Sequence, residues 1–216
     1  TGPATFHLPG NHDMYAGGAP YYAVIDMLGQ PASYFCLRND NWQFVAMDTS
    51  LNDSNPRTVA DATFVDDQEI LWMKDKVNNA GGRKTMLLSH HPLFTSFEDI
   101  GGQAINQKML PQVQDILPKL TAWLWGHEHN MVIYKKYQGI LGRCIGHGAF
   151  PVANVPPLVV QHPEVPLEDV TLGTDPTNFY RHGYVLMQLN GASAHLGYFQ
   201  YEADKDTENL LFEEDL

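Results

Sequence analysis

The chain has 216 residues, a length that suits one domain rather than two, and 44% of its residues are hydrophobic, which is a globular composition. Thirteen basic and 25 acidic residues give a formal net charge of −12. That balance excludes a protein that grips nucleic-acid phosphates or an anionic membrane surface, and no apolar run approaches the roughly 20 residues of a membrane-spanning helix.

Short apolar segments separated by turn residues fill the first 62 positions. Pro9-Gly10 ends the first of them, and Gly29 with Pro31 ends a short helix. A turn composition at residues 38–41 lies between two apolar runs, which indicates a hairpin. The predicted elements are a strand at 5–8, a helix at 21–28, hairpin strands at 33–37 and 42–47, and a loop at 48–62.

Helical and strand patterns alternate in the middle of the chain, and strands follow strands towards its end. Ile70, Met73 and Val77 have helical spacing, with acidic residues before them and Gly81-Gly82 after them, so they predict an amphipathic helix. The later predicted elements are strands at 84–88, 121–125, 131–137, 143–146, 184–189 and 194–201, and a helix at 108–117. This order predicts a layered α/β domain.

Two segments stand apart by composition. Residues 151–176 contain six prolines and predict a long surface excursion, which we expect to act as a cap or a partner surface. Residues 202–216 are acidic and are interpreted as a solvated or loosely helical tail.

The two cysteines, Cys36 and Cys144, are in apolar strand-like segments without CxxC spacing. They are interpreted as buried free thiols, with a single disulfide as the alternative. The cysteines do not decide between an oxidising and a reducing compartment. A cytoplasmic location is slightly favoured.

Three polar clusters directly follow predicted strands. The clusters are Gly10-Asn11-His12-Asp13, Ser89-His90-His91-Pro92 and Gly126-His127-Glu128-His129. In α/β sheets, ligands gather in the loops outside the carboxyl ends of strands, so we expect the three clusters to converge on one site. Neutral imidazoles with one amide oxygen suit Zn, Mn, Fe or Co rather than Ca or Mg.

Three motifs occur in the order and with the spacing of the calcineurin-like metallophosphoesterases: GNHD at 10–13, the histidine of HHP at 90–92, and GHEH at 126–129. The chain resembles this family through about Tyr201. The resemblance implies an α/β/β/α sandwich over residues 1–201. It also implies hydrolysis of a small phosphate ester, a phosphomonoester or phosphodiester, at a centre of two divalent metal ions (Mn, Fe or Zn).

The resemblance implies a role for each residue of the motifs. Asn11, His90 and His127 would bind one metal ion and His129 the other. His12 would be the general acid. The remaining candidates for the pocket are Asp13, His91 and His147. Asp13 would orient its loop, and His91 lines the pocket or faces away. His147 borders the pocket or is a loop histidine hydrogen-bonded to the backbone.

The chain departs from the family pattern before GNHD. The family's DxH and GDxx(D or N) motifs precede that point, whereas only residues 1–9 do so here, and the chain begins at Thr1. We therefore interpret it as lacking an amino-terminal portion, and expect one tightly bound ion or none. The alternative function is a noncatalytic metal-binding or scaffold protein of the same fold. A metallo-β-lactamase-like enzyme or a serine hydrolase is excluded, because HxHxDH and GxSxG are absent.

Overall fold

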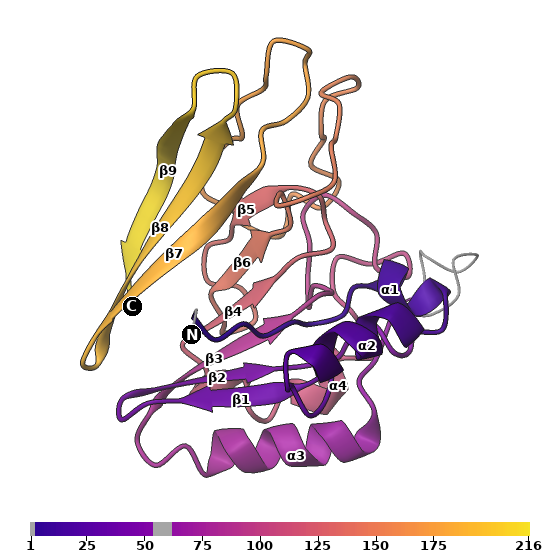
Figure 1. The fold of residues 1–216 in the computed structure, drawn as a ribbon, viewed down its shortest axis with the longest axis vertical. Coiled ribbons are helices and arrows are strands. Elements are labelled where there is room, and N and C mark those ends of the chain that lie inside the picture. The colour runs from indigo at the N-terminus through magenta and orange to yellow at the C-terminus, as the bar shows by residue number, and fades with distance from the viewer. Residues whose placement is uncertain (1–2, 54–61) are drawn as a thin grey trace.

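Two β-sheets lie against each other in the structure, a computed structural model that describes residues 3–53 and 62–216 (Figure 1). The larger sheet has the strand order β1-β2-β3-β4-β6-β5, and the smaller has the order β7-β8-β9. The strands are β1 (Phe35–Arg38), β2 (Trp42–Ala46), β3 (Lys84–Ser89), β4 (Ala122–Trp125), β5 (Met131–Ile133), β6 (Gly142–Ile145), β7 (Gly183–Asn190), β8 (Ser193–Glu202) and β9 (Thr207–Asp215).

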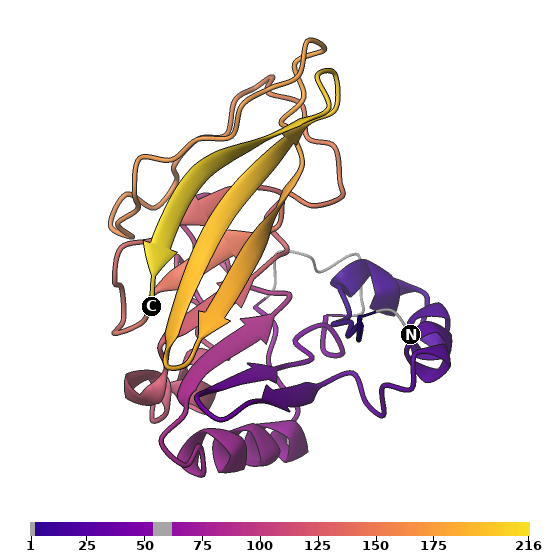
Figure 2. The ribbon, with the colours of Figure 1, turned by 60° about the vertical axis from the view of Figure 1, so that its left-hand side comes forward.

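The helices are short, and the longest, α3 (Asp67–Asn78), lies along the larger sheet. They are α1 (Asn11–Tyr15), α2 (Ala19–Met27), α3 (Asp67–Asn78), α4 (Leu110–Val113) and a 3-10 helix, η1 (Leu117–Lys119). The side chain of Asp66 accepts a hydrogen bond from the backbone N–H of Gln68 and so caps α3. Helices α1 and α2 project to one side of the two sheets (Figure 2).

Parallel pairing dominates the larger sheet. Strands β2, β3, β4 and β6 are neighbours and run parallel, while β1 and β5 are antiparallel edge strands. Every residue of β4 is buried, which is expected for a parallel strand covered on both faces. The carboxyl ends of these parallel strands therefore lie along one edge of the sheet.

Alternate residues of the parallel strands enter two separate cores. On one face, Leu87 and Trp123 pack with Met73 of α3. On the other face, Met86 and Leu124 pack with Leu196 of β8. This alternation produces a helical layer, the larger sheet and the smaller sheet in that order, and it confirms the predicted α/β fold class. Within residues 3–53 and 62–216, no helix covers the outer face of the smaller sheet (Figures 1 and 2).

The predicted strand at residues 5–8 is wrong. The segment is extended, but side chains hold it in place of a strand ladder. Gln30 accepts a hydrogen bond from the backbone N–H of His7 and donates one to the carbonyl of His7, at 2.8 and 2.9 Å. The hydroxyl of Tyr21 donates to the same carbonyl. The predicted loop at 48–62 is described as far as residue 53; residues 54–61 lie outside the described residues.

The predicted helix at 108–117 is broken into two shorter pieces. Asn106 caps the turn before α4 by accepting the backbone N–H groups of Lys108 and Met109. The chain then tightens into η1, where Pro118 lacks the N–H that would continue an α-helix. The strand predicted at 131–137 is also shorter, because β5 ends at Ile133.

The prediction that residues 202–216 form a loosely helical or solvated tail is wrong. Residues 207–215 form β9, which pairs with β8 along its whole length. The guanidinium of Arg143 on β6 donates two hydrogen bonds, at 2.7 and 2.6 Å, to the carboxylate of Glu214. Tyr198 donates a third to the same carboxylate. Burial opposes ionisation of Glu214, but Arg143 outweighs burial and keeps the pKa of Glu214 below its usual value.

The proline-rich segment is irregular, as expected, yet it is anchored to the domain. Val165 and Leu172 are buried, and the hydroxyl of Ser96 donates to the carbonyl of Val165.

Cys36 and Cys144 are both free thiols. No helix in the described part of the chain has both the length and the apolar character needed to cross a bilayer.

Substituting Glu214 with Ala should lower the free energy of unfolding by about 3 to 5 kcal/mol, because it leaves the buried guanidinium of Arg143 without its counter-charge. Urea denaturation measures the effect. Glu213→Ala is the matched control, since the side chain of Glu213 is 61% exposed, and it should change stability by less than about 0.5 kcal/mol. Equal effects of the two substitutions would contradict this account of β9.

Stability should also depend on the protonation of Glu69. Burial raises the pKa of this carboxyl to about 8, so the folded chain holds a proton there at neutral pH that the unfolded chain has released. The contribution of Glu69 to the free energy of unfolding is present at acidic pH and is lost as the pH rises through 8. In wild type, the free energy of unfolding should therefore fall by up to about 1.4 kcal/mol per pH unit between about pH 5 and 8 because of this group. Glu69→Gln should not show this fall.

Urea denaturation at a series of pH values would measure this difference. Glu168→Gln is the control, because the side chain of Glu168 is 43% exposed and its paired lysine is a surface residue. If the free energy of unfolding depends on pH in the same way in wild type and in Glu69→Gln, Glu69 does not retain its proton in the folded chain.

Candidate metal centre

Three connections bring polar side chains to the carboxyl-end edge of the larger sheet. Asn11 begins α1 directly after Pro9-Gly10, His90 follows β3, and His127 follows β4. Strands β3 and β4 are parallel, and Ser89 pairs with Trp125 in their register. The residues that leave the two strands therefore stay together, and the N–H of Gly126 donates to the carbonyl of His90 at 3.0 Å.

Ligand atoms of these three side chains converge. The Nε2 atom of His90 lies 3.1 Å from Oδ1 of Asn11 and 3.2 Å from Nδ1 of His127. Around an ion with bonds of about 2.0 to 2.1 Å, neighbouring ligand atoms of a tetrahedral site are roughly 3.3 Å apart. The donor set of two imidazole nitrogens and one amide oxygen thus fits a single divalent transition-metal ion.

His91 belongs to the same cluster but is held differently. One ring nitrogen each of His90, His91 and His127 lies within 4.8 Å of the others. However, both ring nitrogens of His91 have other partners, Oγ1 of Thr49 and Oδ2 of Asp53, each at 3.0 Å. The arrangement makes His91 a buried, hydrogen-bonded neighbour of His90 and His127, and the amide oxygen of Asn11 is available as a ligand atom in its place.

Burial and mutual repulsion keep the two central imidazoles neutral. The pKa of His90 is well below its usual value, first because of burial and then because of neighbouring His91 and His127. Burial likewise lowers the pKa of His127 to about 3, with His91 adding to the effect. Neutral imidazole is the form that binds a metal ion, so this environment favours ligation at neutral pH.

The GHEH turn divides its side chains between the site and the interior. His127 adopts a left-handed backbone conformation, with φ of 65°, which is uncommon for a residue with a side chain. Glu128 is buried, the hydroxyl of Thr95 donates a hydrogen bond to its carboxyl group, and burial raises its pKa to about 7. His129 stacks on Phe150, with ring centroids 4.6 Å apart.

Asn11 is oriented by a neighbour on its own helix. Its amide nitrogen donates to the hydroxyl of Tyr15 at 2.8 Å, which leaves the amide oxygen directed towards His90. The ring of His12 packs at an angle on Tyr15 and is exposed. The carboxylate of Asp13 accepts the backbone N–H of Gly10, a contact that holds the turn before α1.

The structure brings most of the predicted site residues to one place. His12 follows Asn11 on α1 and packs on Tyr15, the partner of Asn11, and His129 follows His127 in the GHEH turn, so both are near the candidate ligands. His147 lies towards the smaller sheet instead, where its Nε2 is 3.4 Å from the carbonyl oxygen of Phe199. Its backbone carbonyl accepts the N–H of Gly183.

Sequence reasoning missed the contacts of three residues that shape the site. Thr49 and Asp53 hold His91, and Tyr15 holds Asn11. The signal for Thr49 was its place three residues after the end of β2, the strand that pairs with β3. The signal for Tyr15 was its spacing of four from Asn11, which places both on one face of a helix.

Comparison with protein families agrees with this geometry. The model of the calcineurin-like phosphoesterases matches residues 2–131, which is more than half of the chain. The chain belongs to the calcineurin-like phosphoesterase family. A search of curated proteins yields no match.

Solved structures share the phosphoesterase fold at low sequence identity. A dimetal phosphatase from Danio rerio has a TM-score of 0.56 and 13% identity, over 97% of this chain and 70% of its own. PhoD has a TM-score of 0.54 and 10% identity, over 85% and 42%. GAP50, described as the anchor in the inner membrane complex of Plasmodium, has a TM-score of 0.52 and 13% identity, over 86% and 55%. The phosphoesterase chain thus spans about half the length of the last two.

Substituting Tyr15 with Phe should weaken binding of Mn²⁺ by roughly 10-fold, because Asn11 loses the hydrogen bond that aims its amide oxygen at the ligand set. Isothermal titration calorimetry on the metal-free chain measures the affinity. Tyr22→Phe on α2 is the control and should bind the ion as wild type does, since Tyr22 is exposed and its hydroxyl has no hydrogen-bond partner among the described residues. An unchanged affinity in Tyr15→Phe would show that Asn11 needs no such support.

Proposed function

We propose that this chain hydrolyses a small phosphate ester, a phosphomonoester or phosphodiester, in a reaction that depends on divalent metal ions. The observation that carries the proposal is the convergence of Asn11 Oδ1, His90 Nε2 and His127 Nδ1 from three separate connections. Membership of the calcineurin-like phosphoesterases supports the reaction class. The dimetal phosphatase among the structural neighbours supports the use of metal ions.

The proposal assigns the metal ligands by position. Asn11, His90 and His127 would hold one ion, and His129 would contribute to a second, with Mn, Fe or Zn as the metals that suit such donors. When bound, divalent ions supply the positive charge that neutralises a phosphoryl group during hydrolysis. This contribution matters here because the chain's own net charge of −12 would otherwise repel a phosphate.

The remaining residues of α1 would handle the proton and the geometry. His12 is exposed beside the ligand set, and in the proposal its ring nitrogen donates a proton to the oxygen of the departing group. Asp13 would keep His12 in place through its hydrogen bond to Gly10, since that bond fixes the turn from which α1 starts.

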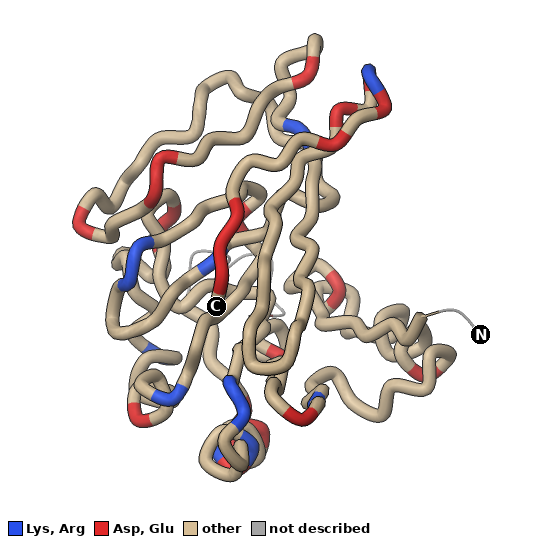
Figure 3. Tube along the Cα trace, turned by 90° about the vertical axis from the view of Figure 1, so that its left-hand side faces the viewer, with Lys and Arg blue, Asp and Glu red and all other residues tan. Residues whose placement is uncertain are grey.

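Charge favours a small substrate over a nucleic-acid strand. Acidic residues occur in many parts of the fold, and three of them follow one another near the carboxyl terminus on β9, at positions 213–215 (Figure 3). A long polyanion would meet this repulsion along its whole length, whereas a small ester need only reach the metal centre.

A noncatalytic metal-binding or scaffold role is the second candidate. In residues 3–53 and 62–216, His90, His91 and His127 form the one group of histidines, cysteines and carboxylates close enough to hold an ion. GAP50 is described as an anchor, and its structure shares this fold. A protein of this kind would bind an ion at the cluster without turning over an ester.

Metal content and turnover, measured on the same Mn-loaded protein, separate the two candidates. Wild type should hydrolyse p-nitrophenyl phosphate or bis(p-nitrophenyl) phosphate and lose that activity on treatment with EDTA. Asn11→Ala and His90→Ala should lose both the ion and the activity. His12→Ala should keep the ion and lose about 10²- to 10⁴-fold in kcat, as expected for removal of a general acid.

His195→Ala is the control, because His195 lies exposed on β8, and it should retain both metal and activity. Full metal binding without hydrolysis of either ester would favour the noncatalytic candidate. Hydrolysis that survives both EDTA and His90→Ala would exclude the proposed metal centre.

A further inference from the structure

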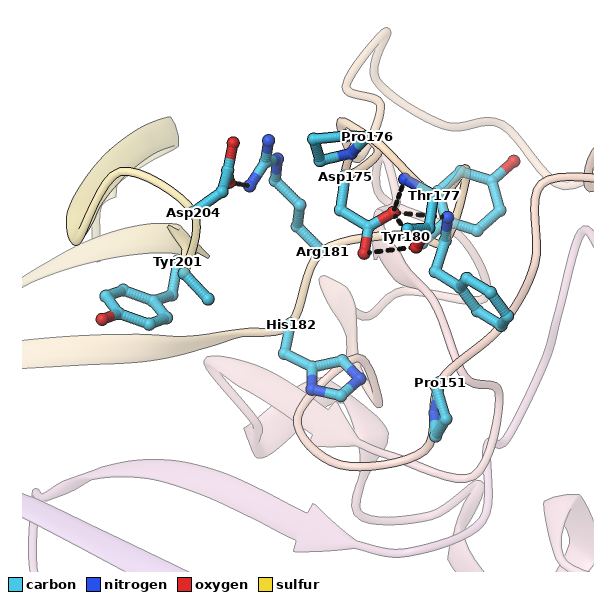
Figure 4. A pocket seen from close by; sticks show the side chains of 11 residues that line it. Pro151, Asp175, Pro176, Thr177, Tyr180, Arg181, His182, Tyr201 and Asp204 are labelled. Atoms are coloured by element: carbon cyan, nitrogen blue, oxygen red, sulfur yellow. Dashed lines mark hydrogen bonds and ion pairs between the residues drawn. The ribbon is translucent and has the colours of Figure 1, made fainter.

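A cavity of about 730 Å³ lies where the start of β7, the end of β8 and the two ends of the proline-rich segment meet (Figure 4). Its volume is in the range of about 300 to 1,000 Å³ that is typical of small-molecule sites. Aromatic and proline rings make up much of its wall: Phe179, Tyr180, His182, Tyr201, Pro151 and Pro176.

The charged groups in this cavity already have polar partners. The guanidinium of Arg181 donates to Asp204 at 2.5 Å and to the carbonyl of Thr174 at 3.0 Å. Asp175 accepts hydrogen bonds from the backbone N–H and the hydroxyl of Thr177, as the dashed lines in Figure 4 show. A charged ligand group would have to displace one of these contacts, so the cavity favours an uncharged group.

The aromatic side chains direct their polar atoms elsewhere. The hydroxyl of Tyr180 donates to Asn154, and that of Tyr201 donates to Asp206. Neither Asn154 nor Asp206 lines the cavity, so the rings and not the hydroxyls are available to a ligand. The side chain of His182 makes no hydrogen bond or ion pair with the described residues, which leaves its imidazole free for a ligand heteroatom.

One loop joins the cavity to the metal centre. Phe150, whose ring stacks on that of His129, directly precedes Pro151 of the cavity wall. At the other end of the loop, His147 contacts Gly183, which directly follows His182. In Figure 4, Pro151 and His182 lie together on one side of the cavity. The cavity wall therefore begins one residue after Phe150, the side chain that stacks on His129 of the GHEH turn.

We propose that this cavity binds an uncharged aromatic group of the substrate while the phosphate of the same molecule occupies the metal centre. The inference rests on the proposed function and narrows it to aryl or heteroaryl phosphate esters. It assigns Phe179, Tyr201 and His182 to substrate specificity, a role separate from that of the metal ligands.

Equilibrium binding to the full chain loaded with Mn²⁺ tests the inference without any need for turnover. The probes are methyl phosphate, 1-naphthyl phosphate and phosphate-free 1-naphthol, each titrated by calorimetry. Wild type should bind 1-naphthyl phosphate about 10-fold more tightly than methyl phosphate, a difference of about 1.4 kcal/mol. Phe179→Ala and Tyr201→Ala should each reduce this ratio at least threefold and leave the affinity for methyl phosphate unchanged.

Tyr184→Ala is the matched control, because Tyr184 is as exposed as Tyr201, at 40%, but lies outside the cavity. It should preserve the ratio. Both cavity substitutions replace partly exposed rings, and melting curves would confirm that the variants fold.

The probes separate failure of the inference from failure of the proposed function. Equal affinity for the two phosphates, or a ratio that both cavity substitutions leave intact, would overturn the inference while phosphate binding still supports the proposed function. If methyl phosphate does not bind but 1-naphthol does, with loss in Phe179→Ala, the aromatic site stands and the proposed function fails.

Discussion

The parallel register between β3 and β4 is the constraint on which the site depends. Ser89 pairs with Trp125 at the last position of both strands, and the side chain of Trp123 donates to the hydroxyl of Ser89. The next residues of the two strands must therefore leave the sheet together, which brings His90 beside the GHEH turn. A shift of one residue would turn His90 to the other face, because side chains alternate along a strand.

Burial around this edge sets the chemistry of the imidazoles. An acidic protein would ordinarily favour protonated histidines, yet His90 and His127 have lowered pKa values because they are buried and face one another. The carboxylate of Asp53 is hydrogen-bonded to His91, which is not one of these two imidazoles. The neutral state of these imidazoles is thus a product of packing.

Much of the fold could be predicted because its signals are local. The spacing of Ile70, Met73 and Val77 identified α3, and the turn at 38–41 identified the β1–β2 hairpin. The acidic composition of residues 202–216 misled, because Glu214 of β9 is held in the fold by the guanidinium of Arg143. That partner is 71 residues away along the chain, and composition cannot reveal a contact at such a separation.

By itself, the sequence determined the family and the kinds of ligand atoms, since GNHD, the strand histidine and GHEH carry that chemistry in short motifs with a definite order. Only the tertiary structure decided that Asp53 and Thr49 hold His91, that Tyr15 orients Asn11, and that an aromatic cavity begins next to Phe150, which stacks on His129. Hydrogen bonds and cavities arise where segments distant in sequence meet, and the packing of the two sheets sets those meeting points.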